Sequence, residues 1–417
     1  MHAIEHILAM HAGLDHVHAG DLITVNVDLA GINDLYLQVL ESFWEMGARQ
    51  VRNPERVVFL FDHYAPPSTI KSAENQRAMR AFAAEQGIDR LLDIHEGVCH
   101  QALWQHGWMK PGMLVAITDS HATTHGAFGA FSTGVGATDM AGILLSGKLW
   151  LRVPEVIKVE IRGDLPPDTM AKDVMLTVLR TLHADGAVFK AVEFCGEGTR
   201  KMSLDQRTVL ANMSVELGAK ASFIPVDGVL KSELEKRASG PYTVPTTDPT
   251  YAYADQFTID VSELEPQIAL PGAVDNAVRV ASVLETPIDQ VYIGGCTGGA
   301  LEDMEATAAQ VRRGRVHKGV KLIVSPASSS IYLQALEKGC IAEIVRAGGT
   351  VINPGCGPCL GVHQGILASG EVCVSTASRN FPGRMGSREA RIYSASSATA
   401  AASAIQGCLA LPAKERP

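Results

Sequence analysis

The sequence lacks any apolar run of about 18 residues or more, the length that a membrane-spanning helix needs. The first residues carry histidines and acids but no basic region, so they do not resemble a secretory signal peptide. Basic residues are also fewer than acidic ones: the chain has 36 Lys and Arg and 45 Asp and Glu, which gives a net charge of −9. We therefore expect neither a membrane nor a nucleic acid as partner, because both favour a basic surface.

Cysteine is scarce, with 8 residues in a chain of 417. A disulfide-stabilised scaffold has a much higher density, so clustered cysteines here indicate metal or redox chemistry in a reducing compartment. We therefore expect a cytoplasmic protein.

Length and composition predict several folded domains. Hydrophobic residues make up 46% of the chain and charged residues 19%, a balance that supports large cores. A chain of 417 residues exceeds one ordinary core, so two to four domains are expected. Breaks rich in proline or glycine lie at Val153–Pro154, at 240–250 and at 265–271. The predicted domains are 1–152, 153–270 and 271–417.

One pattern recurs along the chain: a short apolar run is followed at once by polar residues or glycines. Such runs, separated by helical patterns, are typical of parallel strands in an α/β fold. Ligands bind beyond the carboxyl ends of such strands, so we expect the residues after the runs to meet in one cleft. The runs are 57–61 before Asp62 and His63, 113–118 before Asp119, 291–293 before Cys296, 350–352 before Cys356, and 372–375 before Arg379 and Arg384.

The sharpest local motif is Cys356-Gly-Pro-Cys359, whose tight turn brings two sulfurs together. Such a pair can be a redox dithiol, half of a zinc site, part of an iron–sulfur site, or two buried thiols. Cys296 lies in a second glycine-rich turn, 294–299, which lets the backbone approach a bulky inorganic group. Three cysteines without a fourth leave one metal position open for Lewis-acid catalysis. With His363 as fourth ligand, a zinc site fits the spacing as well.

Two predicted strand ends place a carboxylate beside an imidazole, in Asp62-His63 and in Asp119-Ser120-His121. An aspartate can fix the tautomer of a histidine and raise its basicity, which suits proton transfer. Either pair alone could equally be a capping aspartate and a surface histidine, but two equivalent pairs favour catalysis. His100 is a third candidate, although a single histidine of this kind is more often structural.

Two arginines, Arg379 and Arg384, flank a turn near the end of the chain. Guanidinium groups bind carboxylates through paired hydrogen bonds, so the two arginines suit a substrate with two carboxylates. The simpler interpretation is a solvated, charged loop.

Together these motifs resemble the signature of the aconitase superfamily, and the resemblance runs from Gly20 to the last predicted helix. Within the superfamily, 97–101 and 378–386 are most similar to large subunits of 3-isopropylmalate dehydratases, and the homoaconitase large subunits are very close. The matching segments are 118–121, 124–127, 134–136, 294–297, 356–361, 379–384 and 397–401.

The resemblance implies three α/β domains around a central cleft and a [4Fe–4S] cluster whose fourth iron has no protein ligand. That iron binds the hydroxyl and a carboxylate of a dicarboxylate or tricarboxylate substrate. Cluster binding is implied for Cys296, Cys356 and Cys359, catalysis for Asp62, His63, His100, Asp119, His121 and Glu193, and substrate binding for Arg379, Arg384, Ser378 and Ser120. Glu193 alone would be taken for a surface acid at a strand end.

The family also has a swivelling domain that carries a serine base. This sequence ends shortly after the last large-subunit motif. We therefore expect that domain in a separate small subunit, and we expect this chain alone to be nearly inactive.

Departures from the family pattern bear on the substrate. Gly295 and Gly298 stand where Ser and Asn are usual, Ala122 where Thr is usual, and Ser378 where Asn is usual. A buried hydrogen bond to a charged partner contributes roughly 1.5–3 kcal/mol, enough to change substrate choice. The expected reaction is the 3-isopropylmalate/2-isopropylmalate isomerisation of leucine biosynthesis. Homoaconitase or 2,3-dimethylmalate dehydratase activity is the alternative.

Two other classes of function fit parts of the pattern. A non-catalytic iron–sulfur sensor that binds RNA fits the cysteines, but the acidic balance disfavours it. A zinc hydrolase or thiol redox enzyme fits the C-x-x-C pair, but it leaves the Asp-His pairs and the arginines without a role.

Overall fold

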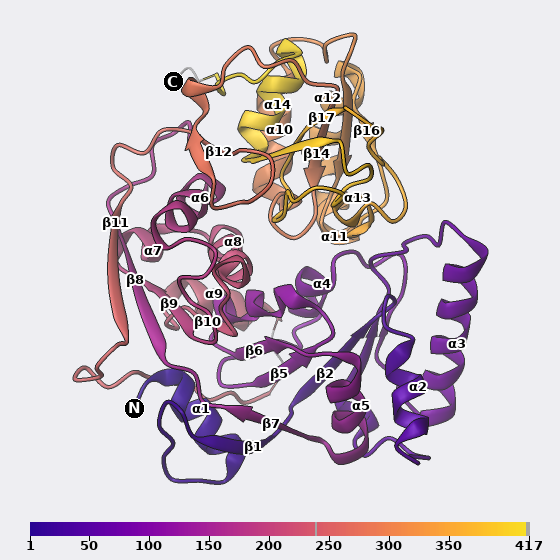
Figure 1. Ribbon diagram of the computed structural model, residues 1–417, viewed down its shortest axis with the longest axis vertical. Coiled ribbons are helices and arrows are strands. Elements are labelled where there is room, and N and C mark those ends of the chain that lie inside the picture. Colours follow the sequence, from indigo (N-terminus) through magenta and orange to yellow (C-terminus); the bar gives the residue numbers. More distant parts are fainter. Residues whose placement is uncertain (238–239, 414–417) are drawn as a thin grey trace.

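The structure is a computed structural model that describes residues 1–237 and 240–413. Figure 1 shows three α/β units, each built around its own sheet, that meet near the middle of the molecule. This arrangement confirms the predicted α/β class. Within the described residues, no helix is long and apolar enough to cross a membrane.

The first unit contains an all-parallel sheet with the strand order β4-β3-β2-β5-β6. Strands β3 and β5 are buried along their whole length, as continuous apolar runs in parallel sheets are. The strands are β2 (Leu29–Asn33), β3 (Val57–Leu60), β4 (Leu91–Leu92), β5 (Leu114–Ile117) and β6 (Phe131–Gly134). The helices are α1 (Ala3–Ala12), α2 (Gln38–Glu45), η1 (Pro54–Arg56), α3 (Ile70–Gln86), α4 (Cys99–Gln105), η2 (Ser120–Phe128) and α5 (Ala137–Ser146).

The second unit has a parallel sheet with the order β10-β9-β8-β11, and it shares one hydrophobic core with the first. In that core the rings of Trp104 and Phe128 stack with centroids 4.3 Å apart. An antiparallel pair, β1 (Leu22–Asn26) with β7 (Lys148–Arg152), precedes this unit. The strands are β8 (Val156–Arg162), β9 (Ala191–Cys195), β10 (Ala221–Phe223) and β11 (Asp255–Asp260), and the helices are α6 (Ala171–Leu182), α7 (Glu197–Lys201), α8 (Leu204–Met213), η3 (Ser214–Leu217) and α9 (Gly228–Arg237).

The third unit has seven strands in the order β13-β12-β18-β17-β14-β15-β16, and β12 runs antiparallel to both neighbours. The strands are β12 (Gln267–Ala269), β13 (Ala277–Arg279), β14 (Gln290–Gly294), β15 (Lys321–Ser325), β16 (Thr350–Val351), β17 (Val372–Ser375) and β18 (Arg391–Ala395). The helices are η4 (Val280–Ser282), α10 (Leu301–Val311), α11 (Ser329–Glu337), α12 (Cys340–Ala347), α13 (Gly357–Leu360) and α14 (Ser397–Gln406). Strand β12 belongs to this third sheet although it lies before the predicted domain boundary at residue 270. The division of the chain into three domains stays a prediction.

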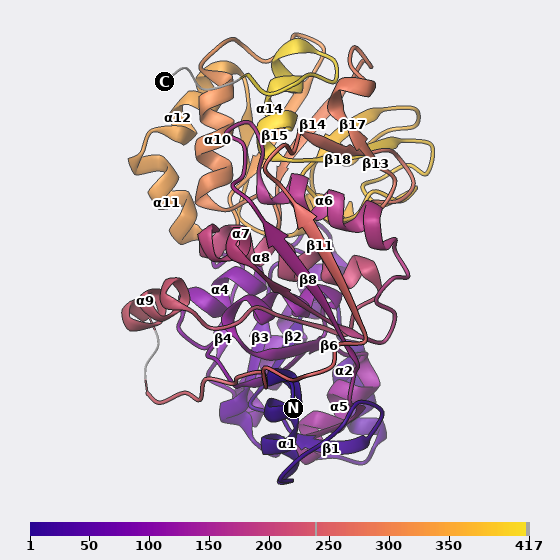
Figure 2. The ribbon, with the colours of Figure 1, turned by 90° about the vertical axis from the view of Figure 1, so that its left-hand side faces the viewer.

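The three units touch where the carboxyl ends of their strands meet. The amide of Cys356, in the third unit, donates a hydrogen bond to the carbonyl of Asp62 in the first, at 2.7 Å. Gly97, just before α4, approaches the third unit so closely that a Cβ there would lie 2.3 Å from the carbonyl oxygen of Ala327. Helix α6 links the second and third units, and Figure 2 shows it between them. The predicted strand-end residues are therefore brought to one region.

Candidate active site

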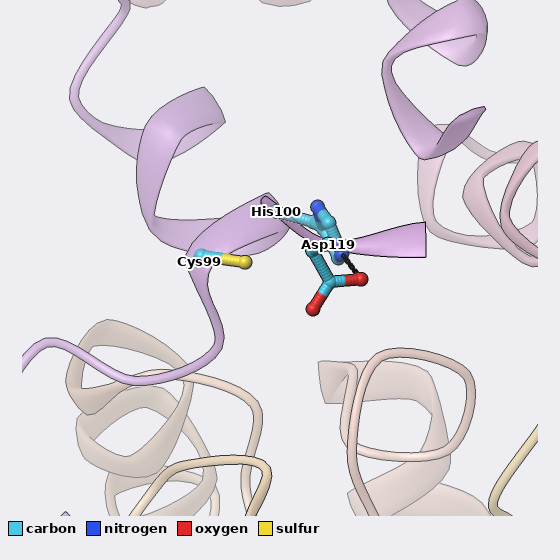
Figure 3. Close-up of side chains that lie close together, drawn as sticks. All are labelled: Cys99, His100 and Asp119. Atoms are coloured by element: carbon cyan, nitrogen blue, oxygen red, sulfur yellow. Dashed lines mark ion pairs between the residues drawn. The ribbon is translucent and has the colours of Figure 1, made fainter. Parts of the chain in front are cut away.

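Asp119 is the centre of a group of three imidazoles. It follows β5 and accepts a hydrogen bond from the amide of His121, which fixes the start of η2. Its carboxylate oxygens lie 3.4 Å from His100 Nε2, 3.6 Å from His121 Nδ1 and 3.6 Å from His63 Nε2. Figure 3 shows His100 and Asp119 facing each other, with Cys99 beside them. The structure therefore joins both predicted Asp-His motifs and His100 in one cluster.

Asp119 stays ionised within this group. Burial acts to raise its pKa, but hydrogen bonds with His100 and His121 hold that pKa well below its usual range. A carboxylate that keeps its charge can hold several imidazoles in place and favour their protonated forms.

His63 has its own carboxylate partners. Its Nδ1 lies 2.7 Å from Asp62 and 3.6 Å from Asp34, and its amide donates to Asp34. Burial acts to lower the pKa of His63, but these two carboxylates raise it well above the usual value. The two carboxylates therefore favour the protonated form of His63, which can supply a proton. Asp34 was not predicted, although it follows the buried strand β2 as the predicted residues follow theirs.

The second ring nitrogen of His121, Nε2, contacts residues of the other two units. It lies 3.1 Å from Glu216 and 2.8 Å from the hydroxyl of Ser378. Glu216 also accepts a hydrogen bond from Arg379 Nε at 2.7 Å. Burial acts to lower the pKa of His121, but hydrogen bonds to Asp119 and Glu216 raise it. A chain of charged groups thus runs from Asp119 to the predicted substrate arginine.

Glu193 is not brought into this chain. It lies inside β9, where its carboxylate is 2.7 Å from His2 Nε2 and accepts a hydrogen bond from the hydroxyl of Tyr253. Because His2 Nδ1 accepts from the amide of Ile4, its Nε2 carries the proton that it donates to Glu193. These contacts fasten the start of α1 to the second sheet. The glutamate that contacts His121 is instead Glu216, and a catalytic role for Glu193 stays a prediction.

The three predicted cluster cysteines are free thiols at the ends of β14 and β16. Cys359 is buried, whereas Cys296 and Cys356 are partly exposed. A hydrogen bond from Cys356 holds the pKa of Cys359 well below its usual range, and Arg384, whose Nη2 lies 3.6 Å from Cys359 Sγ, lowers it further. The thiol of Cys296 donates to the amide oxygen of Asn212 at 3.5 Å, and burial raises its pKa to about 12.

A buried lysine provides positive charge behind the cysteines. Lys172 of α6 donates hydrogen bonds to the hydroxyl of Thr297 and the carbonyl of Thr376, both at 2.8 Å. Burial lowers its pKa to about 8, while negative charge at Cys296 and Cys359 acts to raise it. Bound thiolates would therefore keep Lys172 protonated, as they would Arg384. Lys172 was not predicted from the sequence, because its position on a helix gives no sign that it reaches another unit.

This donor set fits an iron–sulfur cluster better than a single zinc ion. Ligands of one ion must converge on a point, whereas each thiolate of a cluster binds a different iron. In the described part of the chain, Cys296, Cys356 and Cys359 form no group whose ligand atoms all lie within 4.8 Å. His363, the suggested fourth zinc ligand, belongs to no such group of converging ligand atoms in the described part of the chain either.

Polar atoms that could receive a ligand are concentrated at the same place. Among the described residues, the buried side-chain atoms without a hydrogen-bond partner include His100 Nδ1, Tyr292 Oη and Arg384 Nε. Buried polar groups are normally paired, so such a concentration favours a polar ligand. A cavity of about 320 Å³ reaches this region from outside and is lined by Asp119 and by Ser120, which is exposed.

Two departures from the family pattern have a structural explanation. A Cβ at Gly298 would lie 2.1 Å from the hydroxyl oxygen of Thr376, so the larger usual side chain does not fit. That hydroxyl is fixed by hydrogen bonds with both backbone groups of Gly294, at 2.8 and 3.0 Å. Ser378 uses its hydroxyl to contact His121, as described above.

Comparison with known proteins agrees with this geometry. The profile of the aconitase family (aconitate hydratase) matches residues 5–287 and 280–407. The chain belongs to the aconitase family. It is therefore a hydro-lyase, as the resemblance predicted.

Several members of the aconitase family are similar over nearly their whole length. The 3-isopropylmalate dehydratase large subunit 1 of Methanopyrus kandleri is 46% identical over 404 residues, which are 97% of this chain and 96% of the relative. A probable methanogen homoaconitase large subunit of Methanothermobacter thermautotrophicus is 43% identical over 420 residues, covering 100% and 98%. Aconitase X of Thermococcus kodakaraensis has the same fold, with a TM-score of 0.52, 14% identity and 93% of each chain covered.

The two glutamates give a test of the site within this aconitase-family chain. We expect Glu216→Gln to lower kcat about 10²-fold or more, because His121 and Arg379 lose a charged partner. Glu193→Gln is the matched control and should lower thermal stability without changing kcat by more than about twofold. The measurement is steady-state kinetics together with melting temperatures for both variants. A larger kcat loss in Glu193→Gln would return Glu193 to the catalytic group.

Proposed function

We propose that this chain is the large subunit of a dehydratase that binds a [4Fe–4S] cluster on Cys296, Cys356 and Cys359. The observation that carries the proposal is the meeting of these cysteines with the Asp119 group. Asp62 and Cys356 are joined by a backbone hydrogen bond, and the thiol of Cys359 lies beside Arg384. When bound, a cluster with one open iron supplies a Lewis acid that polarises a departing hydroxyl.

The chain's own residues then manage protons around the substrate. His63 and His121, whose pKa values are raised, hold protons that can follow a leaving hydroxide. Asp119 keeps its charge and orients the imidazoles, so little reorganisation is needed during the reaction. We assign proton transfer to Asp62, His63, His100, Asp119 and His121, with Glu216 in place of Glu193.

The two arginines provide the sites for substrate carboxylates. Arg379 is held at Nε by Glu216, which leaves its terminal nitrogens to bind a carboxylate in the paired manner. Arg384 is buried and its Nε has no hydrogen-bond partner among the described residues. Ser378 and Ser120 complete the predicted substrate contacts, one beside His121 and the other at the cavity opening.

The proposed substrate is a 2-hydroxydicarboxylate, with 3-isopropylmalate as the first choice. Relatives named 3-isopropylmalate dehydratase large subunits, at 42–46% identity, support this choice. Relatives named homoaconitase large subunits, at 43–45% identity, support the alternative of a longer tricarboxylate. Gly298 and Ser378 differ from the residues usual in the family, and such differences can change substrate choice. We therefore keep 2,3-dimethylmalate as a third substrate to test.

The name "large subunit" in these relatives supports a separate small subunit as the obligatory partner. We also propose that the enzyme works in the cytoplasm, since all eight of its cysteines are free thiols.

The test is anaerobic reconstitution of the chain with iron, sulfide and the small-subunit protein of the same organism. Each of the three hydroxyacids is then supplied, and formation of the unsaturated acid is followed by its absorbance. We expect dehydration of 3-isopropylmalate only when both subunits are present. Absence of activity with all three acids, despite a fully assembled cluster, would contradict the proposed function.

A further inference from the structure

The face beside the cavity opening carries a group of exposed apolar side chains. Leu22, Trp150 and Phe189 are 74%, 68% and 71% exposed, and Val188 lies next to Phe189. They line a groove of about 620 Å³ formed by β1, β7 and the segment before β9. Scattered apolar residues are normal on protein surfaces, but several in one groove indicate an interaction site.

Phe189 adds a second, independent observation. Its φ of 58° lies in the left-handed region, which a bulky residue rarely adopts. Most of the Phe189 side chain is exposed, so packing within this chain does not offset the backbone strain. The ammonium of Lys220 lies over the Phe189 ring, 4.8 Å from its centroid. Strain of this kind is typical of binding and switch regions.

The groove is continuous with the opening of the active site. Thr133, Gly134, Val135 and Lys220 line both the groove and the cavity that reaches Asp119. A protein bound in the groove would therefore reach over the site where the missing base must arrive. The rim carries both signs of charge, with Arg152, Lys190 and Lys220 beside Asp139 and Glu155, so the apolar side chains and the position at the opening carry the argument.

We infer that this groove, which we call the Trp150–Phe189 groove, is the docking surface for the small subunit. The inference rests on the proposed function, because that function requires a second subunit at the opening. Trp150 and Phe189 act as the apolar anchors of the interface.

Phe189→Gly separates docking from folding. Glycine adopts a φ of 58° without strain, so the melting temperature of the isolated chain should stay the same or rise. Affinity for the small subunit should fall at least about tenfold, because an anchor side chain is lost. Trp150→Ala should also lower the affinity for the small subunit at least about tenfold. Leu333→Ala, at a 60% exposed position on α11, is the control and should leave that affinity unchanged.

The experiment measures binding of the small-subunit protein by calorimetry and self-association by ultracentrifugation. Wild-type affinity in both groove variants would overturn the inference, and so would loss of self-association with unchanged small-subunit binding, since a second copy would then occupy the groove. If the wild type binds the small subunit tightly and the groove variants bind it weakly, but no dehydratase activity is found, the proposed function is contradicted and the docking surface is supported. No binding by the wild type would overturn both.

A second inference concerns Tyr292 of β14. Its side chain packs in one buried cluster with Cys356 and Cys359, and its hydroxyl has no hydrogen-bond partner among the described residues. A buried hydroxyl without a partner is costly, so it is expected to have a use.

The position of that hydroxyl points to the cysteines. A Cβ built on Gly295 would lie 3.9 Å from both the Tyr292 hydroxyl and Cys359 Cβ, so the three groups surround one small space. We propose that the Tyr292 hydroxyl donates a hydrogen bond to a sulfur of the bound cluster and raises its reduction potential.

Tyr292→Phe tests this without relying on turnover. The reconstituted variant should assemble the cluster, and its reduction potential should shift to a more negative value, because the reduced cluster loses a hydrogen bond. Tyr393→Phe, at a buried position of β18 in the same sheet, is the matched control and should leave the potential unchanged. Equal potentials for Tyr292→Phe and the wild type, measured by redox titration with electron paramagnetic resonance, would overturn the proposal.

Discussion

Cys356→Ser should abolish cluster assembly and, with it, nearly all activity. The variant keeps the fold, because serine is close in size to cysteine and Cys356 is partly exposed. It removes one of three thiolates, and an alkoxide does not replace a soft sulfur ligand for iron. Loss of the Lewis acid removes several kcal/mol of transition-state stabilisation, so kcat should fall roughly 10³-fold or more.

The measurement is iron and sulfide content after anaerobic reconstitution, together with the visible absorbance of the protein. Cys408→Ser is the control, because Cys408 is also a partly exposed free thiol and lies after α14, outside the site. Full iron content in Cys356→Ser would remove Cys356 from the cluster ligands.

Asp119→Asn should have the second largest effect. The amide keeps the shape of the side chain but removes the charge that three imidazoles share. We expect kcat to fall about 10²- to 10⁴-fold, as for loss of a general acid–base group. The pH dependence should change in a defined direction. Because Asp119 helps to raise the pKa of His121, its removal lets His121 lose its proton at a lower pH.

Activity that requires protonated His121 should therefore decline at lower pH in Asp119→Asn than in the wild type. Asp28→Asn is the matched control, since Asp28 lies 2.6 Å from His11 in an Asp-His pair outside the site. That variant should lower thermal stability and leave the kcat–pH profile in place. An unchanged profile in Asp119→Asn would show that the Asp119–His121 contact has no part in proton transfer.

Most of the site was predictable because it follows one local rule. Polar residues directly after short apolar runs predicted strand ends, and β3, β5, β14, β16 and β17 are confirmed as parallel strands. The C-x-x-C turn and the glycine-rich turn are also local features. Residues whose place depends only on their own strand were therefore found from sequence.

Residues placed by packing between units could not be found in this way. Glu216 lies on η3, after α8, and reaches His121 because the second unit packs against η2. Lys172 lies on a helix and contacts the third unit through its far end. Glu193 was predicted at the site, but it lies within β9 rather than after it. Its carboxylate contacts His2, the residue that caps α1.

The central claim is that three cysteines hold a [4Fe–4S] cluster whose remaining iron receives the substrate. Mössbauer spectroscopy of the chain reconstituted with ⁵⁷Fe, with its small subunit and with 3-isopropylmalate or another accepted hydroxyacid, tests it most directly. We expect about one iron in four to change its spectrum when substrate is added, because three irons keep their thiolate ligands. A spectrum in which no iron responds to an accepted substrate, or a preparation that binds zinc and no cluster, would contradict it.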